Sequence, residues 1–129
     1  MKKIKDIFQS ARPAFSGSQK SSPLVEWFRV WIDDATISLQ VNPPNRESWE
    51  AQIRWERVIR VCFNAGDLYN PDEIYIFTDE RPESYVIPTE ASGGHDLWNE
   101  IVRRKLFDAE VAIEAMAAIN KLFCCPPIE

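Results

Sequence analysis

Hydrophobic and polar residues alternate through residues 51–63, where the odd positions are apolar except at Arg57. A period of two is typical of a β-strand with one face in a core. Because thirteen residues are long for one strand and Arg57 breaks the alternation, we expect two strands that meet at a corner or bulge near Glu56 and Arg57. The inner face of this ribbon is expected to carry odd-numbered residues such as Ile53, Ile59, Val61 and Phe63.

Four further segments have the alternation or the composition of strands. They are residues 24–32, 35–41, 73–78 and 85–87. Asp33 and Asp34 supply the turn of a hairpin between the first two segments. Residues 74–77 are apolar on both faces, which predicts a central strand. Because the connections between the six strands are short, an antiparallel meander is the expected topology.

From Asp96 onward the apolar residues follow the period of a helix. One helix is predicted to carry the stripe Leu97, Trp98, Ile101, Val102 and Leu106. Asp108 is predicted to be the N-cap of a second helix that carries apolar residues as far as Ile119. These elements predict an α+β fold, in which a strongly bent antiparallel sheet or partly open barrel of about six to seven strands is closed by one or more C-terminal helices.

The 129 residues fit a single domain of ordinary composition, with 45% hydrophobic and 27% charged residues. Residues 1–22 lack a sustained period and carry five basic side chains and one acidic one, a net charge of +4. We therefore expect a mobile basic arm at residues 1–22 and one folded domain at residues 23–129. The domain carries ten basic and nineteen acidic side chains, a net charge of −9, which argues against nucleic acid and favours a basic protein partner.

The three cysteines, Cys62, Cys124 and Cys125, are odd in number and lack the spacing of a metal site. Adjacent cysteines seldom form a disulfide with each other. We therefore expect reduced thiols in a cytoplasmic protein, with Cys124 and Cys125 as a feature of the tail. No apolar run approaches about 18 residues, so neither export nor a membrane span is expected. We expect no metal and no cofactor.

His95, the only histidine, follows Gly93 and Gly94 at the predicted start of a helix. A histidine in this position suits a general base, but no nucleophile neighbours it in sequence and we favour an exposed loop residue. The glycine pair suits either an anion cradle made of free backbone N–H groups or a flexible connection. Gly93, Gly94 and His95 are therefore the candidate site for a small anionic ligand.

Six carboxylates fall within seventeen residues and form the most acidic stretch of the chain. They are Asp67, Asp72, Glu73, Asp79, Glu80 and Glu83. Their spacing matches neither an EF-hand nor a glycosidase pair, so the alternatives are solvated loops and a docking face for a basic partner. Both faces of the first strand carry aromatic residues, so Trp27 or Trp31 is expected to be exposed. We include Trp31 in the candidate interaction surface, since an exposed tryptophan often marks an interface.

Five segments carry a resemblance to a known family. They are the hairpin at residues 28–41, the motif Trp55-x-x-Val58-Ile59-Arg-Val61-x-Phe63, the strand Asp72-Glu-Ile-Tyr-Ile-Phe77, the strand Tyr85-Val-Ile-Pro88 and the helix from Asp96. Over about residues 24–120 the chain resembles small bacterial proteins that have a pleckstrin-homology-like (PH-like) domain and no assigned activity. The resemblance implies a strongly bent antiparallel sheet closed at one end by the helix.

The resemblance also bears on lipid binding. Pleckstrin-homology domains that bind phosphoinositides use basic residues in and around the loop between the first two strands. In this chain that loop is Asp33 and Asp34, whose carboxylates would repel a phosphorylated headgroup. Phosphoinositide binding is therefore not expected.

Our interpretation of the sequence is a non-enzymatic protein-interaction module of PH-like fold, whose partner is a basic protein or a second copy of the chain. The alternative is a small-ligand or anion-binding protein that uses the start of the helix near Gly93 to His95. No single constellation of residues specifies a reaction.

Overall fold

The computed structural model of the protein describes residues 23–127. The predicted basic arm at residues 1–22 lies outside them. The elements in chain order are α2 (Leu24–Trp27), β1 (Phe28–Ile32), β2 (Thr36–Val41), β3 (Trp49–Arg54), the 3-10 turn η1 (Trp55–Arg57), β4 (Val58–Ala65), β5 (Glu73–Thr78), β6 (Arg81–Pro88), α3 (Gly94–Arg103), α4 (Ala109–Met116) and β7 (Lys121–Cys125). The predicted α+β class is confirmed, and residues 24–27 form a short helix where a strand was expected.

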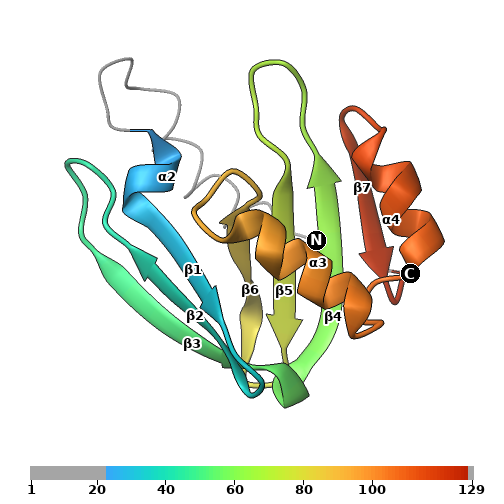
Figure 1. Ribbon diagram of the computed structural model, residues 1–129, viewed down its shortest axis with the longest axis horizontal. Coiled ribbons are helices and arrows are strands. Elements are labelled where there is room, and N and C mark those ends of the chain that lie inside the picture. The colour runs from blue at the N-terminus through green and yellow to red at the C-terminus, as the bar shows by residue number, and fades with distance from the viewer. Residues whose placement is uncertain (1–22, 128–129) are drawn as a thin grey trace.

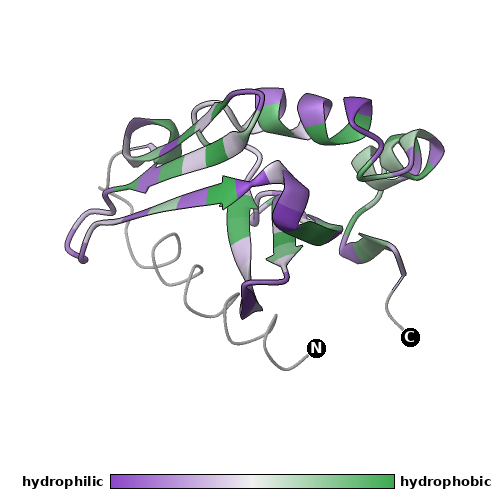
Figure 2. Ribbon diagram, turned by 90° about the horizontal axis from the view of Figure 1, so that it is seen from below, coloured by the Kyte–Doolittle hydropathy of each residue, from purple (hydrophilic) through white to green (hydrophobic). Residues whose placement is uncertain are grey.

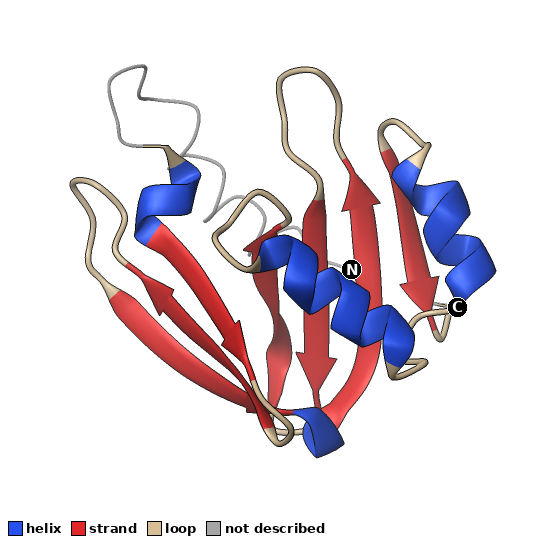
Figure 3. Ribbon diagram, viewed as in Figure 1, coloured by secondary structure: helices blue, strands red, loops and turns tan. Residues whose placement is uncertain are grey.

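The strands form two antiparallel sheets, with the orders β1-β2-β3 and β6-β5-β4-β7. The sheets meet at η1 and spread apart from it (Figure 1, Figure 3). The predicted corner near Glu56 and Arg57 is therefore confirmed as the 3-10 turn between β3 and β4. Trp55 fixes this corner, because its indole N–H donates a hydrogen bond of 2.9 Å to the carbonyl of Asp33 in the β1–β2 turn.

The β1–β2 turn is built around the side chain of Asp33. One carboxylate oxygen of Asp33 accepts hydrogen bonds from the backbone N–H groups of Thr36 and Ala35, at 2.7 and 2.8 Å. These bonds lower the pKa of Asp33 below its ordinary value. The carboxylate thus holds the predicted hairpin turn together in its charged form.

A β-bulge at the start of β4 changes which side chains face the core. The register with β5 shifts between Val58 and Arg60, so Ile59 is the extra residue. The expectation that Ile59 lies on the inner face is wrong, because its side chain is 56% exposed while Val61 and Phe63 are buried. A bulge turns the strand locally and redirects its side chain, which a strict period of two does not include.

The loop before α3 covers the outer edge of β1. The Val30 N–H donates to the carbonyl of Ser92 at 2.7 Å, and the Ser92 N–H donates to the carbonyl of Phe28 at 2.9 Å. Gly93 follows with φ of +84°, and a Cβ there would lie 2.2 Å from the carbonyl oxygen of Val30. Only glycine allows the chain to approach β1 this closely and turn into α3.

Helix α3 lies across the opening between the two sheets (Figure 1). Its outer side is polar and the side toward the sheets is apolar (Figure 2), and Leu97, Trp98 and Ile101 are buried. The predicted stripe is confirmed as far as the helix extends. Beyond Arg103, Lys105 has φ of +63° and the Leu106 N–H donates to the carbonyl of Ile101 at 3.1 Å. This left-handed cap ends the helix and separates α3 from α4.

Helix α4 begins at the predicted N-cap. The Asp108 carboxylate accepts hydrogen bonds from the N–H groups of Glu110 and Val111, at 2.9 and 3.0 Å. The helix ends at Met116, so Ile119 lies in the following turn.

Strand β7, which was not expected, pairs with β4 and places Cys124 opposite Cys62. These residues form a disulfide, so the expectation that all three thiols are reduced is wrong and only Cys125 is free. Cytoplasmic location stays a prediction. Among the described residues, no helix has the length and apolarity needed to cross a membrane.

Candidate functional site

The acidic stretch is divided between the two ends of β5. Asp67 and Asp72 precede the strand, Glu73 is its first residue, and Asp79, Glu80 and Glu83 follow it. Six residues at about 3.3 Å each separate the two groups by roughly 20 Å. The structure therefore does not bring the six carboxylates together on one face.

The carboxylates at the start of β5 accept hydrogen bonds from nearby residues. Asp67 accepts hydrogen bonds from the N–H groups of Tyr69 and Asn70, and Asp72 accepts one of 2.7 Å from the Gly66 N–H. Glu73 is 1% exposed and accepts a hydrogen bond of 3.3 Å from the Tyr75 hydroxyl. The inclusion of Glu73 in a docking surface is therefore wrong, because its side chain points into the protein.

The carboxylates after β5 lie beside basic residues of the corner. Asp79 is 3.2 Å from the Arg57 guanidinium, and Glu80 is 3.8 Å from that of Arg54. Both pairs are about half exposed, so each contributes little to stability. They nevertheless reduce the negative charge that this end of β5 offers to a partner.

The Gly93-Gly94-His95 segment forms the N-terminus of α3, with His95 exposed. Both glycines lie against backbone, since a Cβ on Gly94 would be 2.4 Å from the carbonyl oxygen of Thr89. Close packing of the loop thus gives a structural reason for the glycine pair. Anion binding at this helix start stays a prediction.

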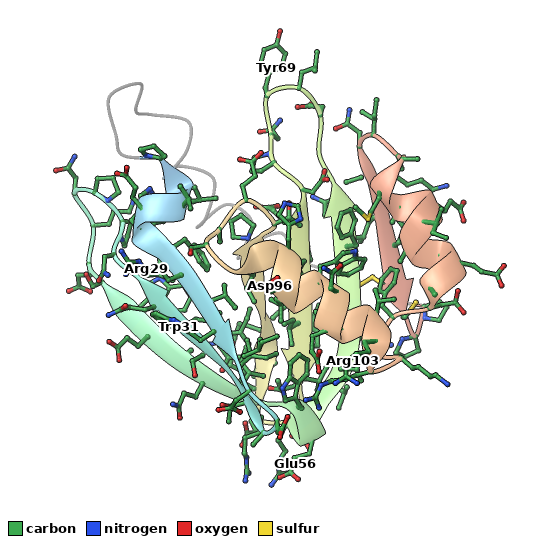
Figure 4. The ribbon with its side chains drawn as sticks, in the orientation of Figure 1. Arg29, Trp31, Glu56, Tyr69, Asp96 and Arg103 are labelled. Carbon is green, nitrogen blue, oxygen red and sulfur yellow. A yellow bond between two sulfur atoms is a disulfide. The ribbon has the colours of Figure 1, made fainter. Side chains whose placement is uncertain are left out.

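Trp31 is the exposed tryptophan of the first strand, as expected, while Trp27 is buried. Its side chain is 51% exposed and lies on the outer face of the β1-β2-β3 sheet (Figure 4). Ser38, Gln40 and Gln52 surround it in a shallow depression. The face is polar apart from the indole.

A group of exposed apolar side chains on α4, on β7 and on the turn between them was not expected from the sequence. We call it the α4–β7 surface, and its side chains are 39% to 74% exposed. It consists of Ile113, Met116, Ile119 and Leu122. The sequence of α4 contained a signal for this surface, because the helix has more apolar residues than the two that it buries, Ala112 and Ala115.

The β4–β5 loop carries two more exposed side chains, Leu68 and Tyr69, and Tyr69 lies at its tip (Figure 4). This loop is connected to the turn after α4, because the Asn120 N–H donates to the carbonyl of Gly66 at 3.2 Å. The base of the loop therefore lies beside the turn after α4.

Within residues 23–127, strand β7 also forms the least protected sheet edge. The edge of β1 is covered by Ser92, β6 contains Pro82 and Pro88, and the β3 edge carries charged residues. Proline and charge both oppose the addition of another strand. Strand β7 has one charged residue, Lys121, and no other strand of the described region pairs with its outer edge.

A pocket of about 620 Å³ lies where α3 ends, between the start of α4, β4 and the end of β7. We call it the α3–β7 pocket. Its apolar lining includes Val58, Ile59, Val102, Leu106, Phe107 and Cys125. Its basic lining consists of Arg60, Arg103 and Lys105, and its one acidic residue is Asp108.

The three basic residues of the pocket have different partners. The Arg103 guanidinium forms an ion pair with Glu100, which raises the pKa of Arg103. Hydrogen bonds from Arg103 and Arg104 lower the pKa of Glu100 to about 2. Arg60 donates instead to the carbonyl of Pro126 at 2.9 Å. Within the part of the chain that the structure describes, no carboxylate lies within 4 Å of the charged groups of Arg60 or Lys105.

No family model, curated protein or solved structure matches the chain. The residues that the structure describes hold no group of three or more His, Cys, Asp or Glu side chains that would bind a metal ion.

Proposed function

We propose that the protein is a non-enzymatic interaction module that binds an extended segment of a partner protein at the outer edge of β7. The observation that carries the proposal is the outer edge of β7, with which no other strand of residues 23–127 pairs, beside the α4–β7 surface. Soluble domains rarely leave such edges open, because they attract further strands. The PH-like character of the fold is part of the proposal, supported by two antiparallel sheets with a helix across their opening.

An added strand would meet apolar side chains on both of its faces. Helix α4 extends beyond β7 in two perpendicular views (Figure 1, Figure 2), with Ile113 and Met116 exposed. Leu122 lies on the opposite face of β7, because its neighbour Phe123 points into the core that α4 covers. Main-chain hydrogen bonds would supply affinity and these side chains specificity, as in known strand-addition complexes.

The negative charge of the protein favours a partner segment that is flanked by basic residues. Glu110 and Glu114 lie on the exposed side of α4, and residues 23–129 carry a net charge of −9. A segment with alternating apolar residues flanked by lysine or arginine would be attracted to this surface and would bind faster at low salt.

Selection from a random peptide library displayed on phage tests the proposal. We expect the full chain to enrich peptides with alternating apolar residues and flanking basic residues. Met116→Glu should weaken binding of these peptides by at least tenfold, because it places a charge on the apolar surface. Ile59→Glu is the matched control, since Ile59 is exposed to a similar extent but lies in the α3–β7 pocket.

A second measurement examines the strand addition itself. Methylation of alternate backbone nitrogens of a selected peptide should abolish binding, because it removes main-chain donors that the β7 edge needs. Equal binding of the methylated peptide, or equal binding by Met116→Glu and Ile59→Glu, would contradict the proposal. A wild-type dimer that Met116→Glu dissociates would show that the occupant is a second copy of the chain.

A further inference from the structure

We propose that the α3–β7 pocket binds a small amphipathic anion, a molecule with an apolar body and one carboxylate or similar acidic group. This inference is independent of the partner proposed for the β7 edge. Its volume of about 620 Å³ falls within the range of small-molecule sites.

The apolar part of the ligand has a continuous lining. Val58, Val102 and Leu106 line the pocket from β4, from α3 and from the segment after it. The bulge adds Ile59, whose side chain it turns away from the core and toward the pocket. Bulges often redirect a side chain next to a functional site. Covering these groups with an apolar ligand removes their surface from water.

We infer the acidic group of the ligand from the basic residues that line the pocket. Three basic residues and one acidic residue line the pocket, although residues 23–129 are strongly acidic overall. The carboxylate of Asp108 is already engaged by the N–H groups at the start of α4. Arg60 and Lys105 therefore supply positive charge that no described carboxylate within 4 Å offsets. An anion is the ligand that this pocket favours.

The fold fixes the backbone of Lys105 and the guanidinium of Arg60. The N–H groups of Lys105 and Leu106 bond to the carbonyls of Val102 and Ile101, which fixes the backbone of Lys105 at the rim of the pocket. The guanidinium of Arg60 is anchored on the carbonyl of Pro126. The same backbone bonds occupy carbonyl groups at the end of α3, which would otherwise repel an anion. Groups that are ordered before binding lose less entropy when a ligand arrives.

Titration with decanoate, followed by calorimetry on the full chain, tests this inference. We expect saturable binding at one site, and Lys105→Gln should raise the Kd by about tenfold because a charge-assisted contact is lost. Lys105→Arg should restore most of the affinity. Ile59→Glu should abolish binding by placing a negative charge in the pocket. Ile113→Glu should leave it unchanged, since that residue lies on the α4–β7 surface.

The free thiol of Cys125 provides a second readout at the pocket itself. Without reductant, iodoacetamide should alkylate Cys125 on the native protein, because the other two cysteines form the disulfide. Saturating decanoate should slow this reaction, and 1-decanol at the same concentration should slow it much less. Equal protection by 1-decanol would contradict the role of the basic residues. Decanoate binding that Lys105→Gln and Ile59→Glu leave unchanged would contradict the site.

Vesicles that contain phosphatidylglycerol separate a free ligand from a membrane lipid. We expect no co-sedimentation of the protein with these vesicles at physiological salt. Co-sedimentation that Ile59→Glu removes would overturn the proposal of a free ligand. Failure of decanoate to bind would leave the peptide experiments at β7 unaffected, so the two proposals can fail separately.

Discussion

The indole ring of Trp98 and the phenyl ring of Phe63 lie with their centroids 4.8 Å apart. Trp98 also meets the ring of Phe107 edge to face, at 4.9 Å and an angle of 60°. Tilted aromatic pairs at these distances attract each other beyond the effect of burial alone. Trp98 thus joins α3 to β4 and to the segment before α4, and it is only 4% exposed.

Trp98→Ala is expected to lower the free energy of unfolding by about 3 to 5 kcal/mol, because it removes a buried indole and leaves a cavity. Trp98→Phe should cost much less, since most of the packed surface remains. Urea unfolding followed by far-ultraviolet circular dichroism measures both. A near-native unfolding midpoint for Trp98→Ala would show that the indole serves a binding site and not the core.

Loss of the disulfide is expected to lower the free energy of unfolding by about 2 to 4 kcal/mol, because it joins residues 62 positions apart and restricts the unfolded chain. Dithiothreitol should lower the melting temperature of the wild type but not that of Cys124→Ser. Cys125→Ser should behave as the wild type. Detection of three free thiols in the denatured, unreduced protein would contradict the pairing.

Because Glu100 forms ion pairs with Arg103 and Arg104, we expect the free energy of unfolding to depend on pH in the acidic range. Its pKa is lowered from 4.5 to about 2 in the folded protein by hydrogen bonds from Arg103 and Arg104. A lowered folded pKa stabilises the protein above pH 4.5, and this contribution is lost as the pH falls through about 2. Wild type should therefore exceed Glu100→Gln in stability at pH 6, with the difference shrinking toward pH 2. A difference that is constant between these pH values would exclude the ion pairs as its cause.

A left-handed backbone conformation costs a residue other than glycine about 1 to 2 kcal/mol. Gly93→Ala should lower the free energy of unfolding by more than this amount. The additional cost arises because the new Cβ would lie 2.2 Å from the carbonyl oxygen of Val30. Ser92→Ala is the control, because Ser92 contacts β1 through its backbone, and we expect a change within about 0.5 kcal/mol. Equal thermal midpoints for Gly93→Ala and wild type would mean that the loop is not held against β1.

Local signals in the sequence predict local structure well in this protein. The break at Arg57 locates η1, and Asp108 marks the start of α4. The run at residues 74–77 identifies β5 as a strand with neighbours on both sides. Each of these features depends on residues that are close in the chain.

Features that depend on distant contacts were not predicted. Strand β7 follows a helix in sequence and has five residues, and it forms because β4 offers an edge that it can pair with. The disulfide could not be predicted without that strand. The outward turn of Ile59 likewise requires the register of β5, which the alternation in β4 does not contain.

The candidate sites also differ in whether they depend on neighbouring residues or on distant contacts. The sequence predicted that Trp27 or Trp31 is exposed, and Trp31 is, but the acidic stretch is divided by the length of β5. The α3–β7 pocket combines residues from four elements between positions 58 and 126. No short motif carries such a site, because its members meet only after α3, α4 and β7 have packed.

The register of β7 also decides which of two neighbouring thiols is oxidised. Cys124 faces Cys62 because Phe123 points into the core and is 9% exposed. A slip by one residue would place Cys125 opposite Cys62 and turn Phe123 to the opposite face of the sheet, away from the core that α4 covers. The choice between the two possible disulfides is therefore made by the burial of a phenyl ring, and Cys125 keeps its thiol because the hydrophobic core holds its neighbour in place.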